Sequence, residues 1–141
     1  MEATVKSLFL KVGSGEPMEP VDELLVVAQR GIEGDRSFGR SNRQVLIVEQ
    51  DVLEVFGLNP GDLRENITVD GIDLNALKPG MNIQIGGSLL QVHGECSPCS
   101  KMDELQPGLQ EAIRGRRGLL ASVIQSGSIS IGDAVKQTSQ E

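Results

Sequence analysis

The chain of 141 residues contains no tryptophan or tyrosine, and only three phenylalanines, two cysteines and one histidine. Without large aromatic residues the core must be built from Val, Ile and Leu, and runs such as VLIV and LLVV are typical of buried β-strands. Two cysteines three positions apart cannot form a disulfide framework. No apolar run approaches the roughly 18 residues that cross a bilayer, and no signal peptide opens the chain. These absences predict a cytoplasmic protein with reduced thiols and no membrane segment.

Basic residues are also scarce, since 13 Lys and Arg face 20 Asp and Glu and give a net charge of −7. Nucleic-acid binding requires a basic surface and is helped by stacking aromatic residues, so this class of partner is excluded. The arginines nevertheless gather in two places, at residues 30–43 and 114–117. The planar guanidinium group suits phosphate. These clusters therefore indicate either a small phosphorylated ligand or ordinary surface ion pairs.

Seventeen glycines and the many short apolar runs predict a mainly β (α+β) protein of one domain, 1–141, with a core over about residues 5–135 and a tail at 136–141. Residues 29–43 have almost no periodic apolar content and are expected to form a long irregular loop. Strands are expected over 3–12, 21–28, 44–48, 63–69, 82–85, 88–92, 119–125 and 128–135, and helices over 49–56 and 101–113. Because no βαβ alternation is present, a closed or nearly closed mixed β-barrel with a few short helices is predicted.

The reactive side chains are concentrated in one stretch, residues 93–103, which holds His93, Cys96 and Cys99 between a predicted strand and a predicted helix. A thiol at the start of a helix faces unpaired backbone N–H groups and the positive end of the helix dipole. That setting favours the thiolate. We therefore expect Cys99 to be chemically active, the alternative being two ordinary buried thiols.

Two other interpretations of this stretch are a redox dithiol and a zinc site. A thioredoxin-like dithiol needs repeated βαβ units, which the chain lacks. A zinc site could use His93, Cys96 and Cys99, but structural zinc usually has four ligands, and Glu95 or Asp103 would have to complete the set.

Several short motifs occur in a fixed order along the chain. They are Gly-Ile-Glu-Gly-Asp-Arg at 31–36, Arg43-Gln44, Pro-Gly-Asp at 60–62, Glu65-Asn66-Ile67, Gly-Ile-Asp-Leu at 71–74, Ile85-Gly86, Pro98-Cys99 and Ile-Gly-Asp at 131–133. In this order the chain resembles MOSC domains, which are named for the C-terminal domain of molybdenum-cofactor sulfurases. The resemblance covers about residues 5–135 and implies a β-barrel of MOSC type.

The resemblance also implies roles for individual residues. Cys99 would carry sulfur as a persulfide or ligate the molybdenum of molybdopterin, and Arg117 would help to hold the cofactor phosphate. Cys96 and His93 are possible accessory residues, and Cys96 could resolve a persulfide on Cys99 as a disulfide. The remaining residues expected to line the pocket are Asp35, Arg36, Arg43, Glu65 and Asn66. One departure is Arg64, at a position that is often glycine in relatives.

The leading hypothesis is a protein that handles the molybdenum cofactor for the sulfuration of molybdoenzymes. No pyridoxal phosphate is expected in this chain, so a cysteine desulfurase would be the sulfur donor, and a molybdoenzyme or cofactor-biosynthesis protein would be the partner. If the protein is an enzyme, it would be of the sulfurtransferase type or a molybdenum-cofactor-dependent reductase. The alternatives are a small cofactor-dependent reductase of N-hydroxylated compounds and a non-catalytic module that docks on a molybdoenzyme or a biosynthetic protein.

Overall fold

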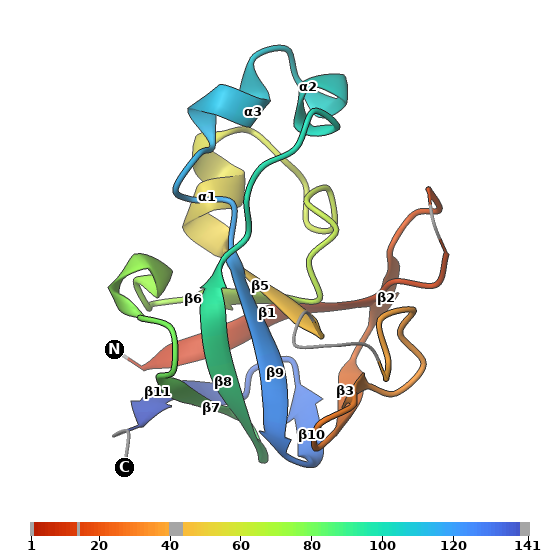
Figure 1. Ribbon diagram of the computed structural model, residues 1–141, viewed down its shortest axis with the longest axis vertical. Coiled ribbons are helices and arrows are strands. Elements are labelled where there is room, and N and C mark those ends of the chain that lie inside the picture. The colour runs from red at the N-terminus through yellow and green to blue at the C-terminus, as the bar shows by residue number, and fades with distance from the viewer. Residues whose placement is uncertain (1, 14, 40–43, 139–141) are drawn as a thin grey trace.

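The computed structural model describes residues 2–13, 15–39 and 44–138, which form eleven strands, three short α-helices and one 3-10 helix (Figure 1). The strands are β1 (Ala3–Leu10), β2 (Glu19–Val21), β3 (Glu23–Val27), β4 (Gly31–Ile32), β5 (Val45–Glu49), β6 (Ile67–Asp70), β7 (Asn82–Ile85), β8 (Ser88–Glu95), β9 (Leu119–Gln125), β10 (Gly127–Ser130) and β11 (Ala134–Thr138). The helices are α1 (Gln50–Val55), η1 (Leu74–Ala76), α2 (Met102–Leu105) and α3 (Leu109–Ala112).

Seven strands form a closed mixed barrel, as predicted. Their order is β11-β7-β8-β9-β5-β6-β1, and the pairing of β11 with β1 closes the ring. Only β5 and β6 run parallel among these neighbours, and the short helix α1 lies on the connection between them. The interior is filled by branched aliphatic residues such as Val5, Ile47 and Leu90, each at most 1% exposed. The barrel therefore has a packed core, and its open ends are where a ligand could bind.

A second sheet lies beside the barrel and consists of β10, β3 and β4. The predicted strand at 128–135 is in fact two strands separated by a turn at Gly132: β10 pairs with β3, whereas β11 returns to the barrel. The predicted strand at 21–28 is also divided, because β2 pairs with β1 and β3 pairs with β10. In both cases a short break in the predicted strand places its two halves in different sheets.

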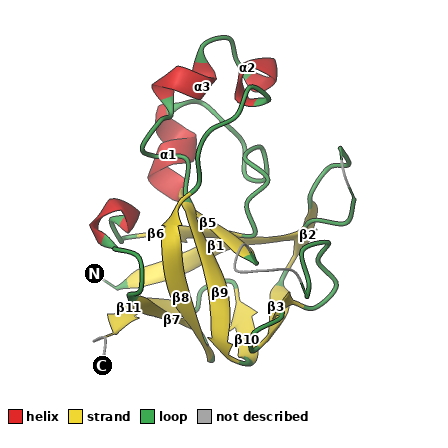
Figure 2. Cartoon of the chain, viewed as in Figure 1, coloured by secondary structure: helices red, strands yellow, loops and turns green. Residues whose placement is uncertain are grey.

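The three α-helices gather at one end of the barrel, where Figure 2 shows them in red above the strands. The predicted helix at 101–113 is interrupted by Gln106-Pro107-Gly108, with Gly108 in the left-handed region at φ 82°. Proline has no N–H to donate, and glycine readily adopts positive φ, so the helix is split into α2 and α3. Leu53, Leu109 and Ile113 form the centre of a second apolar cluster under these helices.

None of the helices in the described part of the chain is long and apolar enough to cross a membrane.

Candidate functional site

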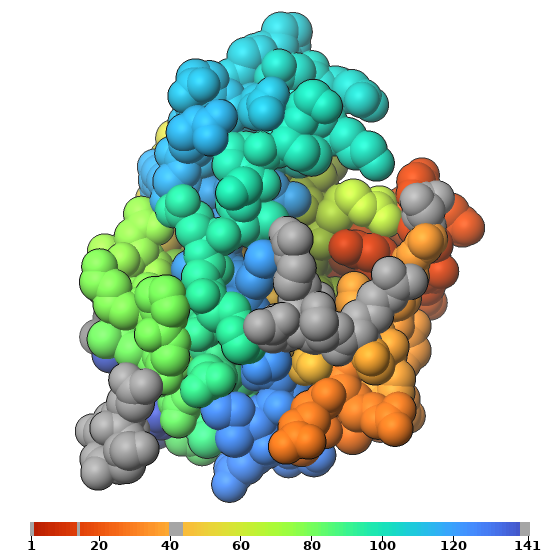
Figure 3. Space-filling model, in the orientation of Figure 1, coloured from red at the N-terminus to blue at the C-terminus, as the bar shows by residue number. Residues whose placement is uncertain are grey.

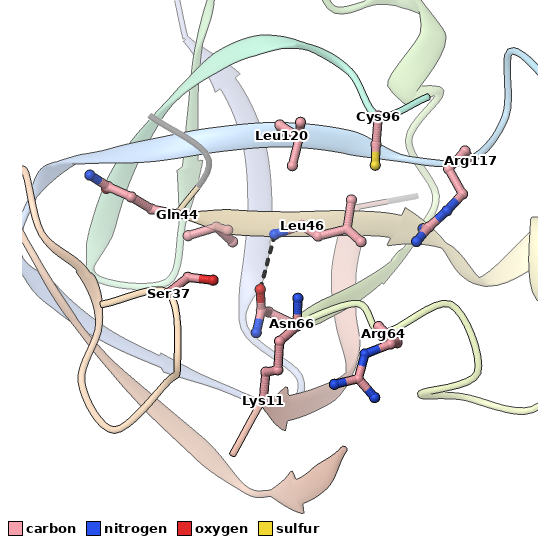
Figure 4. Close-up of a pocket in the computed structure, with 10 residues that line it drawn as sticks. Lys11, Ser37, Gln44, Leu46, Arg64, Asn66, Cys96, Arg117 and Leu120 are labelled. Atoms are coloured by element: carbon pink, nitrogen blue, oxygen red, sulfur yellow. Dashed lines mark hydrogen bonds between the residues drawn. The ribbon is translucent and has the colours of Figure 1, made fainter. Parts of the chain in front are cut away.

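A cavity of about 430 Å³ lies beside β5 and β9. Its lining combines residues that follow β1 and β8, residues that precede β6 and β9, and the start of β5 (Figure 4). The lining residues are Lys11, Ser37, Gln44, Val45, Leu46, Arg64, Asn66, Cys96, Arg117 and Leu120. Its volume lies within the range of small-molecule sites.

Arg117 is the most unusual residue of this cavity. Its side chain is only 7% exposed, and its Nε and Nη1 atoms have no hydrogen-bond partner among the residues that the structure describes. A buried charge without a partner is destabilising by several kcal/mol. Figure 4 shows the guanidinium group pointing from the start of β9 toward Leu46, into the cavity. The position therefore fits a residue that binds an anion.

The backbone around Arg117 explains how the side chain is held there. The next residue, Gly118, has φ 131°, and a Cβ atom at this position would lie 2.7 Å from the carbonyl oxygen of Ile47. Only glycine allows β9 to begin so close to β5. The carbonyl of Gly118 also accepts a hydrogen bond of 2.8 Å from the backbone N–H of Cys96. Arg117 and Cys96 are thus anchored on adjacent chain segments.

Two further cations line the cavity, Lys11 at the end of β1 and Arg64 before β6. Burial lowers the pKa of Lys11, and the positive charges of Arg64 and then Arg117 act in the same direction, opposed by the carboxylate of Asp35. The ammonium group of Lys11 is thus poorly solvated and close to like charges. An anion in the cavity would relieve both effects.

Arg64 has a strained backbone, because its φ of 60° lies in the left-handed region that favours glycine. Its guanidinium group donates to the carbonyl of Glu16 at 2.6 Å and to that of Gly13 at 3.0 Å. These two bonds tie the loop after β1 to the edge of the cavity. Arg64 therefore adds a cation and a loop contact at the expense of backbone strain.

Asp35 and Asn66 were both predicted to line the pocket, and the structure joins them by a hydrogen bond of 3.0 Å from Asn66 Nδ2 to Asp35 Oδ1. The carbonyl of the Asn66 side chain accepts from the Leu46 backbone N–H at 3.0 Å (Figure 4). Asp35 also accepts from the backbone N–H groups of Lys11 at 2.7 Å and Ser37 at 2.9 Å. Asn66 lines the cavity and Asp35 lies behind it, so this pair builds the cavity wall.

Glu65 is fully buried and lies outside the cavity lining. Its carboxylate accepts from the backbone N–H groups of Gly61 at 2.7 Å and Leu63 at 3.1 Å, and from the Thr68 hydroxyl at 3.3 Å. Burial raises the pKa of Glu65 despite these hydrogen bonds, which act in the opposite direction. The strand predicted over 63–69 is therefore wrong for residues 63–66, where Glu65 stabilises a turn.

The two arginine clusters are dispersed in the structure. Arg36 is exposed and does not line the cavity, and Arg30 lies over the ring of Phe38 at 5.9 Å. Arg114 and Arg116 form surface pairs with acidic residues. Arg40 and Arg43 fall outside the described residues, so the expectation that Arg43 lines the pocket stays a prediction. Of the described arginines in these clusters, only Arg117 reaches the cavity.

The two cysteines face different surroundings. Cys96, directly after β8, is 8% exposed and lines the cavity, whereas Cys99 is exposed and lies outside the lining. Between them the residues alternate, since Cys96 and Pro98 are buried and Ser97 and Cys99 are exposed. The helix predicted over 101–113 is also much shorter, because α2 begins at Met102 and has only four residues. The helix-dipole argument for Cys99 therefore loses most of its strength.

Among the residues that it describes, the structure does not bring together the ligands that a zinc site would need. His93 Nε2 lies 2.7 Å from the hydroxyl of Ser122 on β9, and no group of three His, Cys, Asp or Glu side chains in the described segments could hold a metal ion. The closed barrel likewise excludes a thioredoxin-like dithiol. His93 does not line the cavity, so its accessory role has no support from position.

Lys11 and Arg64 were not predicted as binding residues. Lys11 interrupts the apolar sequence LFLKV at the end of β1, and a lone lysine at the end of a buried strand is a signal that could have identified it. Arg64 was noted in the sequence only as a departure from the family pattern, and that departure did not predict a role for it. Neither residue could be assigned to the cavity before the pairing of β1 with β6 was known.

A second cavity, of about 530 Å³, lies beside the first and shares Arg64 with it. Its wall is partly apolar, with Phe9, Met18, Met102 and Leu105 among its residues. Figure 3 shows the cyan segment that contains α2 overhanging the red and yellow-green segments below it. Arg64 thus stands between a polar cavity and a more apolar one.

Comparison with known proteins agrees with this architecture. A model of the MOSC domain matches residues 35–136. The solved structure of YuaD from Bacillus subtilis is 25% identical with a TM-score of 0.79, and the match covers 96% of this chain and 94% of YuaD. YiiM from Escherichia coli is 23% identical with a TM-score of 0.74, over 100% of this chain and 71% of YiiM.

YiiM from Geobacillus stearothermophilus is 21% identical with a TM-score of 0.77, over 97% of this chain and 75% of that protein. At these identities the two YiiM structures support the fold alone. A search of curated proteins gives no match.

Proposed function

The chain belongs to the MOSC domain family, and on that premise we propose that it handles the molybdenum cofactor, with the cavity beside β5 and β9 holding the cofactor phosphate. The observation that carries this proposal is the buried guanidinium group of Arg117, whose Nε and Nη1 have no partner among the described residues. Lys11 and Arg64 add positive charge to the same cavity in a chain whose net charge is −7.

The residues present fit a phosphate group. An arginine binds phosphate through two parallel N–H donors, and a lysine supplies a compact charge. When bound, molybdopterin supplies a molybdenum centre at its dithiolene and a terminal phosphate. Arg117 and Lys11 would hold the phosphate, and Arg64 would contribute charge at the edge of the cavity. Asp35 and Asn66 would keep the wall rigid through their hydrogen bonds to Lys11 and Leu46.

Cys99 is proposed to carry sulfur as a persulfide or to ligate the metal. Its thiol is exposed, so a larger partner such as a cysteine desulfurase or a molybdoenzyme could reach it. This exposure suits exchange between proteins better than the buried position of Cys96 does. The proposed roles thus divide between an anion site in the cavity and a sulfur-carrying thiol on the surface.

The test is to purify the protein from a host that makes the cofactor, then to measure bound pterin by fluorescence after oxidation and persulfide by mass spectrometry. Arg117→Met should reduce bound pterin about tenfold to a hundredfold, because a hydrogen bond to a charged group contributes about 1.5–3 kcal/mol. Cys99→Ser should abolish the persulfide at that position. Arg114→Met removes an exposed arginine and serves as the control.

If the wild-type protein carries neither pterin nor persulfide, and Cys99→Ser changes nothing, the proposal is wrong.

A further inference from the structure

Cys96 is a thiol that the proposed function leaves unused, although it lies in the wall of the cationic cavity. We propose that Cys96 accepts a sulfur atom directly from a small anionic sulfane-sulfur donor, such as thiosulfate, held by Arg117 in this cavity. The inference rests on the anion site of the proposed function but adds a second sulfur-accepting residue and a donor of low molecular mass.

The position of Cys96 supports this role. Its backbone N–H bonds to the carbonyl of Gly118 at 2.8 Å, so it is anchored one residue from Arg117 in the neighbouring segment. Figure 4 shows the sulfur of Cys96 and the guanidinium group of Arg117 directed toward the same space near Leu46. The negative charge of a Cys96 thiolate raises the pKa of Lys11, so these two side chains lie within electrostatic range of each other.

The Cys96 sulfur is also available to react. Its thiol donates a long hydrogen bond of 3.9 Å to the carbonyl of Ser97. A thiol bonded so weakly can turn toward a ligand without losing a strong interaction. In contrast to Cys99, it is enclosed enough that a bound small molecule would exclude most water from it.

The cavity selects the class of donor. Arg117 and Lys11 attract an anion with terminal oxygens, and such an anion must also present an electrophilic sulfur if a thiol is to gain sulfur from it. Thiosulfate has a sulfonate end that fits the guanidinium fork and a sulfane sulfur at the other end. A protein persulfide would reach exposed Cys99 more easily than Cys96, which is 8% exposed.

The transfer needs no added oxidant or reductant. The Cys96 thiolate attacks the sulfane sulfur and forms a sulfur–sulfur bond, while the bond between the sulfane sulfur and the sulfonate sulfur breaks. The electron pair of that bond leaves with sulfite, and the proton released by the thiol passes to solvent. The product is a Cys96 persulfide, and Arg117 and Lys11 stabilise the negative charge that builds up on the departing sulfite.

The experiment incubates the reduced full-length protein with thiosulfate under anaerobic conditions. Peptide mass spectrometry locates added sulfur, and a sulfite assay follows release. We expect wild type and Cys99→Ser to gain one sulfur atom at Cys96 and to release an equal amount of sulfite. Cys96→Ser should gain none, and Arg117→Met should react at least about tenfold more slowly, whereas Arg114→Met should match wild type.

Inorganic phosphate should compete with thiosulfate in the wild-type protein, which tests the anion site without any substitution. The proposal is overturned if sulfur appears only on Cys99, if none appears on Cys96, or if neither phosphate nor Arg117→Met slows the reaction. Such a failure combined with retained pterin would leave the proposed function standing. Sulfur loading of Cys96 in a protein that never retains pterin would support this inference and contradict the proposed function.

Discussion

Replacing Arg117 by methionine should stabilise the ligand-free protein, although the substitution removes a nearly buried arginine. The guanidinium group is taken from water, and its Nε and Nη1 gain no hydrogen bond from any described residue. Methionine keeps most of the aliphatic stem and fills irregular space, but it carries no charge. The stability lost through desolvation of the guanidinium group should therefore be recovered.

The size of the effect follows from these two unpaired donors. A buried polar group left without a partner is destabilising by about 1–3 kcal/mol, and more when charged. Some packing is lost with the shorter side chain, so we expect a net gain of about 1–3 kcal/mol in the free energy of unfolding. For a chain of this length each kcal/mol corresponds to roughly 3 °C in Tm.

The assay is urea and thermal unfolding in a buffer without phosphate or sulfate, with Arg114→Met as the control. Arg114 is 53% exposed and pairs with exposed Glu111, so its substitution should change stability by less than about 0.5 kcal/mol. Phosphate at about 100 times the wild-type Kd should stabilise wild type by about 2.7 kcal/mol, and Arg117→Met, with a tenfold to hundredfold weaker site, by only about 0.4–1.4 kcal/mol. A loss of more than about 1 kcal/mol in Arg117→Met without phosphate would refute the reasoning.

Three further predictions concern the residues around the cavity. Arg64→Gly should be more stable than Arg64→Ala by about 1 kcal/mol in urea unfolding, because both lose the loop contacts but only glycine relieves the positive φ; equal stabilities would show that the backbone is not strained. Since the folded pKa of Glu65 is raised above 4.5, wild type should be most favoured over Glu65→Gln below that pH and should lose this advantage as pH rises through the raised pKa; an advantage that grows with pH would contradict the assignment. Iodoacetamide should modify exposed Cys99 faster than Cys96, and phosphate should slow only the reaction of Cys96; equal protection of both thiols would place them in one site.

The strands that were predicted well are short, mostly apolar runs, of which β7 and β9 also have glycine close to both ends. β5, β7 and β9 agree with their predicted ranges to within one residue. The parallel pairing of β5 with β6 could not be predicted, because nothing local to either strand specifies it. The barrel class was accessible from composition, whereas the order of its strands depends on contacts between distant segments.

The segment at 63–66 shows why local pattern was insufficient. Leu63, Ile67 and Val69 have strand-like spacing, but Glu65 turns its carboxylate back onto the N–H groups of Gly61 and Leu63. This local hydrogen bonding competes with a strand and leaves Arg64 at positive φ. Strand alternation would place the carboxylate of Glu65 on the same buried face as Leu63 and Ile67. A carboxylate at such a position is the signal in the sequence that could have indicated a turn.

Of the residues that the resemblance assigned to a pocket, Asn66 and Arg117 line the cavity. Cys96 rather than Cys99 lies with them. The sequence predicted a long helix over 101–113, whereas α2 has only four residues, and residues 96–99, which belong to no helix or strand, are alternately buried and exposed. Cys96 and Cys99 therefore have different exposure, and only Cys96 lines the cavity.

The most direct test of the central claim is an anaerobic equilibrium titration of the purified protein with molybdopterin released from a molybdoenzyme. Wild type and Arg114→Met should bind the pterin with the same affinity, and Arg117→Met should bind it about tenfold to a hundredfold more weakly. Equal affinity of wild type and Arg117→Met, or no binding by the wild type, would contradict the assignment of the cavity beside β5 and β9 as the cofactor site.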